Sequence, residues 1–495
     1  MRDLAVGIDI GTTGIKAVVI DNFGGILFEA SESHDLLSPH PGFAEEDASI
    51  WWDNVLLLLK KISNSVDTER ICGIALSGMV PTLIPVDDHG HALYNSIQQN
   101  DARAVREIEE YKARIEADAY FSRTGNSVNQ QIIYPKWTWL TRHAPEIVSK
   151  TSFICGSYDY CTYRLTGVPV IERNWALESG MWLIEEETWD EEILRIASID
   201  REKLPKVCSS GDVIGPITPE VAHITGIPNG TPVVVGIADH VASALATGVR
   251  DSGDLLLKLG GAGDILFATD TLRMDPRLFI DYHPLENRYL INGCMAASGS
   301  IVKWITNLFQ DTDFNRLTEE ASQLPPGSKD LILLPYFLGE KTPIFDTNAR
   351  GVFFGLNFGH DRAALFRSVL EAVAYGFYHH VEILQEMGCD VEHVYLSNGG
   401  ARSPLWKQIV LDVIGKDGTY VPNHPGSCIG AAFIVQKSIG PTKDWQALER
   451  FLSRGERIAF SPENHNKYSH YYKTYRDLYE SVKYLFPRLS QEEYS

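Results

Sequence analysis

The sequence has few cysteines and no pairing pattern among them. Its seven cysteines are scattered over 495 residues, and none lies in a CxxC motif. An odd, scattered set disfavours both a disulfide framework and a structural zinc site. We therefore expect free thiols in a reducing cytosol and a cytoplasmic protein.

Long hydrophobic runs and excess positive charge are missing as well. The apolar stretches VVVGIA and LILLPYFL are too short to cross a bilayer, and the start, MRDLAVGIDIG, lacks the basic leader of a secretory signal. Lys and Arg number 44 against 65 Asp and Glu, which gives a formal charge of −21. Nucleic-acid binding needs clustered cations, whereas one local pocket is enough for a small phosphorylated ligand. We expect neither a membrane nor a nucleic acid as partner.

Two segments half a chain apart have the same pattern. LAVGIDIGTTGIKAVVID covers residues 4–21, and GDLLLKLGGAGDILFATD covers residues 253–270. Each is typical of a strand, a turn of small residues and a second strand, which indicates an internal duplication of architecture. The length also favours two or three domains. We predict an N-terminal domain over residues 1–250 and a C-terminal domain over residues 251–495.

The first of these turns carries several polar groups that suit a polyphosphate. Asp9 lies inside the apolar strand, Thr12 and Thr13 offer hydroxyls, and Lys16 offers a cation. The GxxxxGK[ST] pattern of a Walker loop is absent. We interpret the segment as a phosphate-holding hairpin, with Asp9 directed toward Mg²⁺ through water. The alternative is an ordinary hairpin with a buried aspartate.

Glycines mark two further candidate nucleotide contacts. Gly260 and Gly261 lie in the second turn, and Gly399 and Gly400 follow Asn398 in LSNGGARSPLW. Glycine lets the backbone approach a phosphate or a flat ring closely. Strand, Gly-Gly turn and helix in that order also favour a nucleotide at the helix start. The alternative for the later turn is simple helix capping.

Asp239 is the candidate general base. In PVVVGIADHVASALATG an apolar strand pattern ends just before this residue, and a helix of small residues follows. Phosphoryl transfer to a hydroxyl needs a fixed group that accepts the hydroxyl proton. The alternative is a helix N-cap, a position that aspartate favours.

Asp101 and Arg103, in NDARA, are candidates for binding the vicinal hydroxyls of a polyol. Their alternative is a helix start with surface charges. Trp175 is a further candidate to flank a sugar. His379 and His380 fit a satisfied helix face better than a metal site, because no carboxylate or cysteine lies at a ligand spacing.

Taken together, these motifs resemble the FGGY carbohydrate kinases of the actin/hexokinase/Hsp70-like ATPase superfamily, in their xylulokinase-like branch. The resemblance extends from about Leu4 to Gly440 and is carried by GIDIGTTGIKAVVID, GIALSG, NDARA, GIADH, LKLGGAGD and LSNGGARSPLWKQI. It implies an α/β protein with two actin-like, ribonuclease H-like domains and a catalytic cleft between them. Members are often dimers, so a homodimer is the assembly that the resemblance implies.

The resemblance also implies a role for each matching residue. ATP and Mg²⁺ are the implied cosubstrate and metal, with Asp9 near the metal and Asp239 as catalytic base. The residues implied at the nucleotide are Thr12, Thr13, Lys16, Gly260, Gly261, Asn398, Gly399, Gly400 and Ala401. The residues implied at the sugar are Met79, Val80, Pro81, Asp101, Arg103, Asp239 and His240.

One departure from the family bears on the substrate. Xylulokinases typically read SGQMHG where this chain reads SGMVPT, so Met79 and Pro81 replace a glutamine and a histidine. We expect an ATP-dependent kinase that phosphorylates a terminal hydroxyl of a ketose or polyol, a ketopentose such as xylulose first. The alternatives are ribulose, erythrulose or erythritol as acceptor, a non-catalytic sugar sensor, and a phosphohydrolase in which Asp239 activates water.

Overall fold

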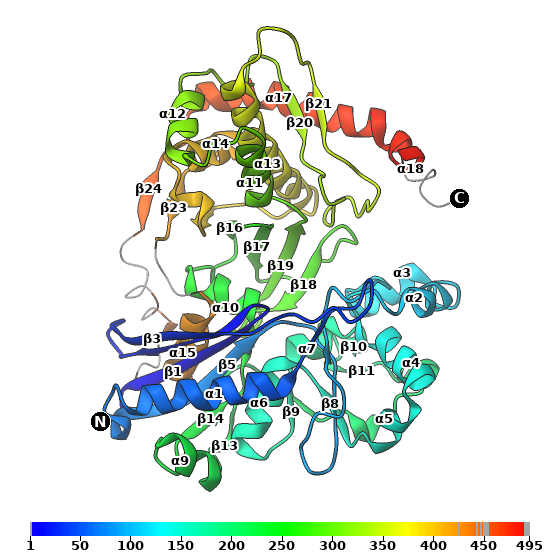
Figure 1. The fold of residues 1–495 in the computed structure, drawn as a ribbon, viewed down its shortest axis with the longest axis vertical. Coiled ribbons are helices and arrows are strands. Elements are labelled where there is room, and N and C mark those ends of the chain that lie inside the picture. Colours follow the sequence, from blue (N-terminus) through cyan, green and yellow to red (C-terminus); the bar gives the residue numbers. More distant parts are fainter. Residues whose placement is uncertain (1, 423–425, 442–443, 446–447, 449–454, 490–495) are drawn as a thin grey trace. The chain divides into compact units, whose positions relative to one another are not determined.

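The computed structural model describes residues 2–422, 426–441, 444–445, 448 and 455–489, and the chain forms two compact units (Figure 1). Unit 1 contains Met1–Gly248, Ile280–Asn287 and His424–Ser453, and unit 2 contains Val249–Phe279, Arg288–Asn423 and Arg454–Ser495. The chain therefore leaves unit 1 after Gly248 and returns to it twice. Among the helices of the described ranges, none is long and apolar enough to span a membrane.

The sheet of unit 1 is built on the first predicted hairpin. Its order is β13-β14-β5-β1-β2-β3, with β15 also paired to β5. The bounds are β1 Leu4–Gly11, β2 Gly14–Ile20, β3 Ile26–Ser33, β5 Ile71–Gly78, β13 Val213–Pro216, β14 Pro232–Val234 and β15 Ile237–Ala238. Strands β1, β2 and β3 are antiparallel, whereas β5 runs parallel to β1, β14 and β15.

Helices and short strand pairs complete unit 1. The helices are α1 Ala48–Ser63, α2 Val105–Lys112, α3 Ala117–Thr124, α4 Ile133–His143, α5 Pro145–Lys150, α6 Ser157–Thr166, α7 Arg173–Glu178, α8 Glu191–Ala197, α9 Pro219–Thr225, α10 Asp239–Ala246 and α15 Ser427–Ser438. The paired strands are β4 Glu45–Glu46 with β7 Ser96–Ile97, β6 Ile84–Val86 with β8 Phe153–Cys155, β9 Val170–Glu172 with β12 Lys206–Cys208, and β10 Trp182–Leu183 with β11 Thr188–Trp189.

The second sheet repeats the order of the first. It reads β18-β19-β17-β16-β22-β23-β24, so β19-β17-β16-β22-β23 matches β3-β2-β1-β5-β14 strand for strand. The bounds are β16 Asp254–Leu259, β17 Gly263–Thr269, β18 Phe279–Tyr282, β19 Tyr289–Met295, β22 His393–Ser397, β23 Gly418–Tyr420 and β24 Glu456–Ile458. Both sheets change from antiparallel to parallel pairing at the same place. The predicted duplication of architecture is confirmed.

Unit 2 is completed by helices and one further strand pair. The helices are α11 Gly299–Leu308, α12 Phe314–Ser322, α13 Arg362–Glu386, α14 Pro404–Ile414, α17 Pro462–Val482 and α18 Phe486–Leu489, and β20 Ile332–Leu334 pairs with β21 Val352–Phe354. The many Tyr, Lys and Glu residues from about Asn464 predict a surface helix. Helix α17 lies there, and it buries one side, which includes Tyr468, Tyr472 and Tyr475. Its tyrosines supply apolar rings to the core of unit 2.

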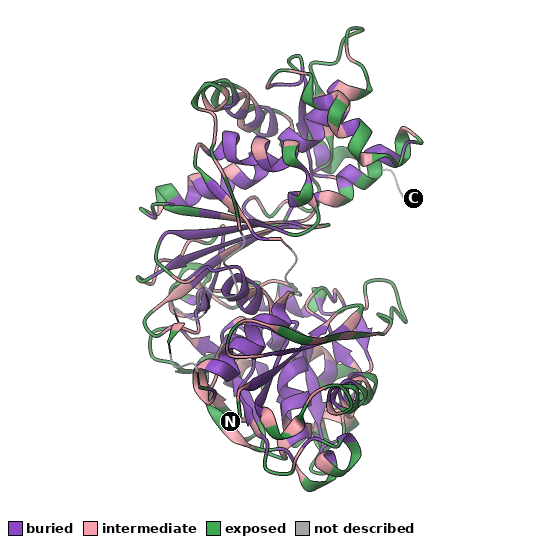
Figure 2. Ribbon diagram, turned by 90° about the vertical axis from the view of Figure 1, so that its left-hand side faces the viewer, coloured by how far each residue is buried: buried purple, intermediate pink, exposed green. Residues whose placement is uncertain are grey.

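Small residues let helix α15 lie directly on the sheet of unit 1. A Cβ added at Gly7 of β1 would lie 2.0 Å from the carbonyl oxygen of Cys428, and one at Gly430 would lie 2.2 Å from that of Ala242 in α10. Only glycine fits such close backbone contacts. The alanine- and glycine-rich segments therefore serve packing. The central strands β1, β5, β16 and β17 are largely buried, whereas the edge strand β3 has no buried residue; buried residues are purple in Figure 2.

Candidate active site

Parallel strands bring two acidic residues to one edge of the unit 1 sheet. In β1, Asp9 lies opposite Ser77 of β5, and on the other side of β5 Ile237 of β15 also lies opposite Ser77. The Ser77 hydroxyl donates to Oδ1 of Asp9 at 2.7 Å. Asp239 follows two residues after Ile237, at the first position of α10. The carboxyl ends of parallel strands are where α/β sheets bind ligands, so this edge is the candidate site.

The first hairpin presents its polar groups outward beside this edge. Thr12, Thr13 and Lys16 are exposed, and Lys16 lies opposite Asp9 in the β1–β2 register. The Thr12 hydroxyl also contacts the sulfur of Met79 at 3.0 Å. Hydroxyls, turn amides and an ammonium group on one exposed turn form a surface that can hold phosphate.

Asp239 combines a fixed backbone with an accessible carboxylate. Its carbonyl oxygen accepts a hydrogen bond from the Ser427 hydroxyl of α15 at 2.9 Å. Its Oδ1 accepts the backbone N–H of His240 at 2.6 Å, and its side chain keeps 39% of its exposure. The residue is therefore held in place and still open to a small substrate.

The SGMVPT segment follows β5 and is buried. Met79, Val80 and Pro81 are all buried, and the carbonyl oxygen of Met79 accepts a hydrogen bond from Ser157 at 2.9 Å. The Trp175 indole donates to the carbonyl of Thr82 at 2.8 Å. This tryptophan has no exposed surface. Trp175 therefore packs against the SGMVPT segment inside the protein. The expectation that it flanks a sugar is wrong.

Asp101 and Arg103 form a closed ionic network. Only 1% of Asp101 and 9% of Arg103 is exposed, so the alternative of surface charges is wrong. The Arg103 guanidinium donates to both oxygens of Asp101 at 2.8 Å and to Glu45 at 2.7 Å. It also lies over the ring of Phe43, 4.1 Å from its centroid, and Ala44 N–H donates to Asp101 at 2.6 Å. The charges of Asp101, Arg103 and Glu45 are therefore paired with one another inside the protein.

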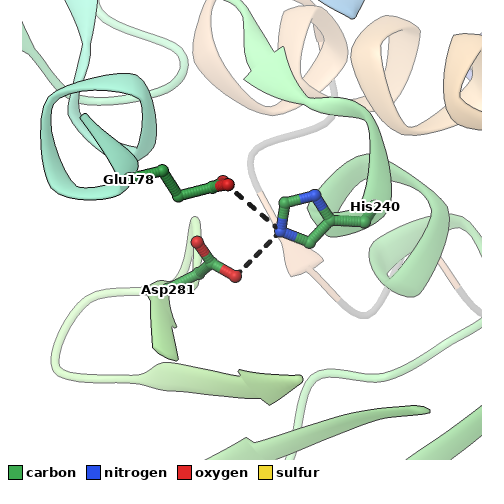
Figure 3. Close-up of side chains that lie close together, drawn as sticks. All are labelled: Glu178, His240 and Asp281. Atoms are coloured by element: carbon green, nitrogen blue, oxygen red, sulfur yellow. Dashed lines mark hydrogen bonds and ion pairs between the residues drawn. The ribbon is translucent and has the colours of Figure 1, made fainter. Parts of the chain in front are cut away.

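A cluster that the sequence did not reveal lies beside Asp239. His240 Nε2 lies 2.8 Å from Oδ2 of Asp281 in β18 and 3.8 Å from Oε1 of Glu178 in α7 (Figure 3). The donor atoms of these three residues lie within 4.8 Å of one another, a spacing that could hold a metal ion. The short contact between His240 and Asp281 favours an ion pair instead. The sequence signal that could have revealed this cluster is Asp281 inside the apolar pattern FIDY, which is similar to Asp9 inside GIDIG.

The nucleotide candidates of unit 2 differ in how accessible they are. Gly261 is exposed in the β16–β17 turn, and its carbonyl oxygen accepts N–H groups of Ser298 and Ser300 at the start of α11. Asn398 and Gly399 are exposed after β22. A Cβ on Gly399 would meet nothing within 4 Å. This part of the turn can therefore receive a ligand.

The rest of that turn is occupied by the protein itself. A Cβ on Gly400 would lie 2.5 Å from the Trp406 ring and 2.8 Å from Leu259. Ala401 is fully buried. In the β16–β17 turn, Gly260 is half-buried.

His380 of α13 has partners within the protein. It forms hydrogen bonds to Thr342 and to the carbonyl of Gly376, both at 2.8 Å, as expected for a satisfied helix histidine.

Comparisons with known proteins agree on one family. The profile of the N-terminal domain of the FGGY family of carbohydrate kinases matches residues 4–246, and that of the C-terminal domain matches residues 273–436. A xylulose kinase of Staphylococcus epidermidis is 27% identical over 98% of both chains. A gluconokinase of Bacillus subtilis is 28% identical over 91% of both chains. The crystal structure of a xylulose kinase from Rhodospirillum rubrum superposes with a TM-score of 0.93 at 38% identity, covering 98% of this chain and 99% of that one.

Proposed function

The chain belongs to the FGGY family of carbohydrate kinases, and we propose that this ATP-dependent sugar kinase acts on the terminal hydroxyl of a neutral ketose. A ketopentose such as xylulose is the favoured acceptor. The observation that carries the proposal is the accessible carboxylate of Asp239 at the carboxyl ends of the parallel strands of unit 1.

Asp239 is the proposed catalytic base. Its carboxylate would accept the proton of the sugar hydroxyl while that oxygen bonds to the γ-phosphorus of ATP. The bond from the γ-phosphorus to the bridging oxygen breaks, and ADP leaves. A carboxylate fixed at the first position of α10 supplies this proton acceptor without further rearrangement.

The exposed groups of the two hairpins are the proposed phosphate contacts. Thr12, Thr13 and Lys16 would bind from the β1–β2 turn, and Gly261 from the β16–β17 turn. Asp9 fits Mg²⁺, because one half-buried carboxylate at a sheet edge suits an ion that keeps most of its waters. The metal would neutralise phosphate charge there.

The charges beside the candidate sugar site favour a neutral acceptor over a sugar acid. Arg103 is bound by Asp101 and Glu45, and His240 by Asp281. The Lys136 ammonium donates to three backbone carbonyls, and burial lowers its pKa to about 7. A substrate carboxylate would have to displace one of these acceptors, which costs more than binding an uncharged hydroxyl chain.

An ADP-release assay tests the proposal. Purified protein with Mg-ATP is offered D-xylulose, D- and L-ribulose, erythrulose, erythritol, glycerol and gluconate, with a no-sugar control and the Asp239→Asn variant. We expect strong turnover with one ketose, little with gluconate, and almost none in the variant. Preferred turnover of gluconate would refute the neutral acceptor. ADP release without sugar would instead favour a phosphohydrolase. If no sugar causes ADP release although the protein still binds ATP, a non-catalytic sugar sensor would be favoured.

A further inference from the structure

Three elements of unit 1 converge on the imidazole of His240. The titratable groups that face it are three carboxyl groups. Asp239 comes from its own helix α10, and Glu178 from the end of α7 and Asp281 from β18 are drawn in Figure 3. Asp281 has no exposed side-chain surface, whereas His240 and Glu178 each keep 21%. Burying a carboxylate is costly unless a positive charge compensates it, and the His240 imidazole lies at bonding distance from Asp281.

The charges of the three groups follow from this packing. Burial opposes a charged imidazole, but Asp281 and the hydrogen bonds to Asp239 and Asp281 outweigh it and hold the pKa of His240 well above its usual value. Burial and the neighbouring charge of Asp281 raise the pKa of Glu178 well above its usual value. The same packing therefore favours a positively charged imidazole and a protonated Glu178.

The other side of the imidazole faces the proposed base. His240 Nδ1 lies 3.3 Å from Oδ1 of Asp239, and the same oxygen accepts the His240 backbone N–H at 2.6 Å. His240 thus contacts Oδ1 of Asp239 both through its backbone N–H and through Nδ1 of its ring. In the part of the chain that the structure describes, no recorded hydrogen bond ends on Oδ2 of Asp239. Oδ2 is the oxygen left to meet a substrate hydroxyl.

We propose that His240, held by Asp281, is a positioning residue that fixes the Asp239 carboxylate so that Oδ2 accepts the proton of the sugar hydroxyl. This inference rests on the proposed role of Asp239. It assigns a function to Asp281, which touches neither substrate nor nucleotide in this scheme. A misplaced carboxylate would slow the chemical step and leave sugar binding largely intact.

The kinetic test compares Asp281→Asn with Glu187→Gln, a matched carboxyl-to-amide change in an exposed pair with Arg173. For Asp281→Asn we expect kcat to fall roughly 10- to 100-fold while the sugar KM stays within about twofold. Glu187→Gln should match the parent protein. A loss expressed only in KM would overturn the proposal, and so would unchanged kinetics with a lower melting temperature.

A double variant and a titration separate this inference from the proposed function. If His240 acts through Asp239, adding Asp281→Asn to Asp239→Asn should lower kcat no further. An additive loss would overturn the proposal. Nuclear magnetic resonance of ¹³C-histidine-labelled protein, assigned with His240→Gln, should show that Asp281→Asn lowers the His240 pKa. This measurement does not depend on turnover, so it tests the contact between His240 and Asp281 even if the acceptor is not a ketose. An unchanged His240 pKa would refute the proposed contact.

Discussion

Replacing Glu172 by glutamine should make the stability of unit 1 less dependent on pH. Glu172 is fully buried and accepts hydrogen bonds from the Tyr158 hydroxyl at 2.9 Å, the Asn174 N–H at 2.9 Å and the Ser210 hydroxyl at 3.0 Å. Burial raises its pKa from 4.5 to about 7, although these hydrogen bonds oppose the shift. The folded protein therefore binds a proton here that the unfolded chain releases above pH 4.5.

The sign and size of the effect follow from linkage. Stability from this group is fully present below pH 4.5 and is lost as the pH rises through about 7. A shift of about 2.5 pKa units corresponds to roughly 3 kcal/mol of unfolding free energy, most of it lost between about pH 5 and pH 8. Glutamine keeps the shape and the neutral character, so Glu172→Gln should flatten this slope.

The assay is urea unfolding at several pH values between about 5 and 8, followed by peptide-resolved hydrogen exchange because a chain of two units need not unfold in one step. Glu340 is the matched control, since burial raises its pKa to about 7 in unit 2. Glu340→Gln should flatten the slope for peptides of unit 2 only. If Glu172→Gln leaves the slope of unit 1 unchanged, Glu172 does not take up a proton on folding and the reasoning is refuted.

Further variants test the site. Asp239→Asn should lower kcat roughly 10²- to 10⁴-fold while the Kd for ATP, measured by calorimetry, is unchanged; equal activity would end its assignment as base. Met79→Gln combined with Pro81→His should raise kcat/KM for xylulose relative to other ketoses, and an unchanged profile would remove this segment from the sugar site. Gly399→Ala should leave the melting temperature unchanged and raise the KM for ATP, whereas Gly400→Ala should lower the melting temperature because its Cβ meets a ring.

Local patterns in the sequence were enough to predict two similar hairpins, whereas the two-domain fold was implied by the family resemblance. The alternation of apolar residues around GIDIGTTGIK and LKLGGAGD marked both hairpins, and both sheets are built on them. The two-domain α/β kinase fold is confirmed by the superposition on a solved xylulose kinase. The return of Ile280–Asn287 and His424–Ser453 to unit 1 was not predictable, because it depends on contacts between distant segments.

The sequence was less informative about which charges meet. NDARA predicted a polar pair, but only the structure shows that Glu45 completes a buried network with Asp101 and Arg103. FIDY carries the same signal as GIDIG, an acidic residue in an apolar strand. A pattern of this kind shows that Asp281 is buried, and it cannot show that a histidine 41 residues away supplies the opposite charge.

The acids around His240 show how environment alone can separate chemical roles. The Asp239 carboxylate is accessible and is the proposed proton acceptor, whereas the Asp281 side chain is fully buried against the His240 imidazole and is proposed to hold that ring in place. Burial and the nearby Asp281 raise the pKa of Glu178 well above its usual value, which favours its neutral form. Different environments for neighbouring titratable groups are how active sites assign acid, base and support.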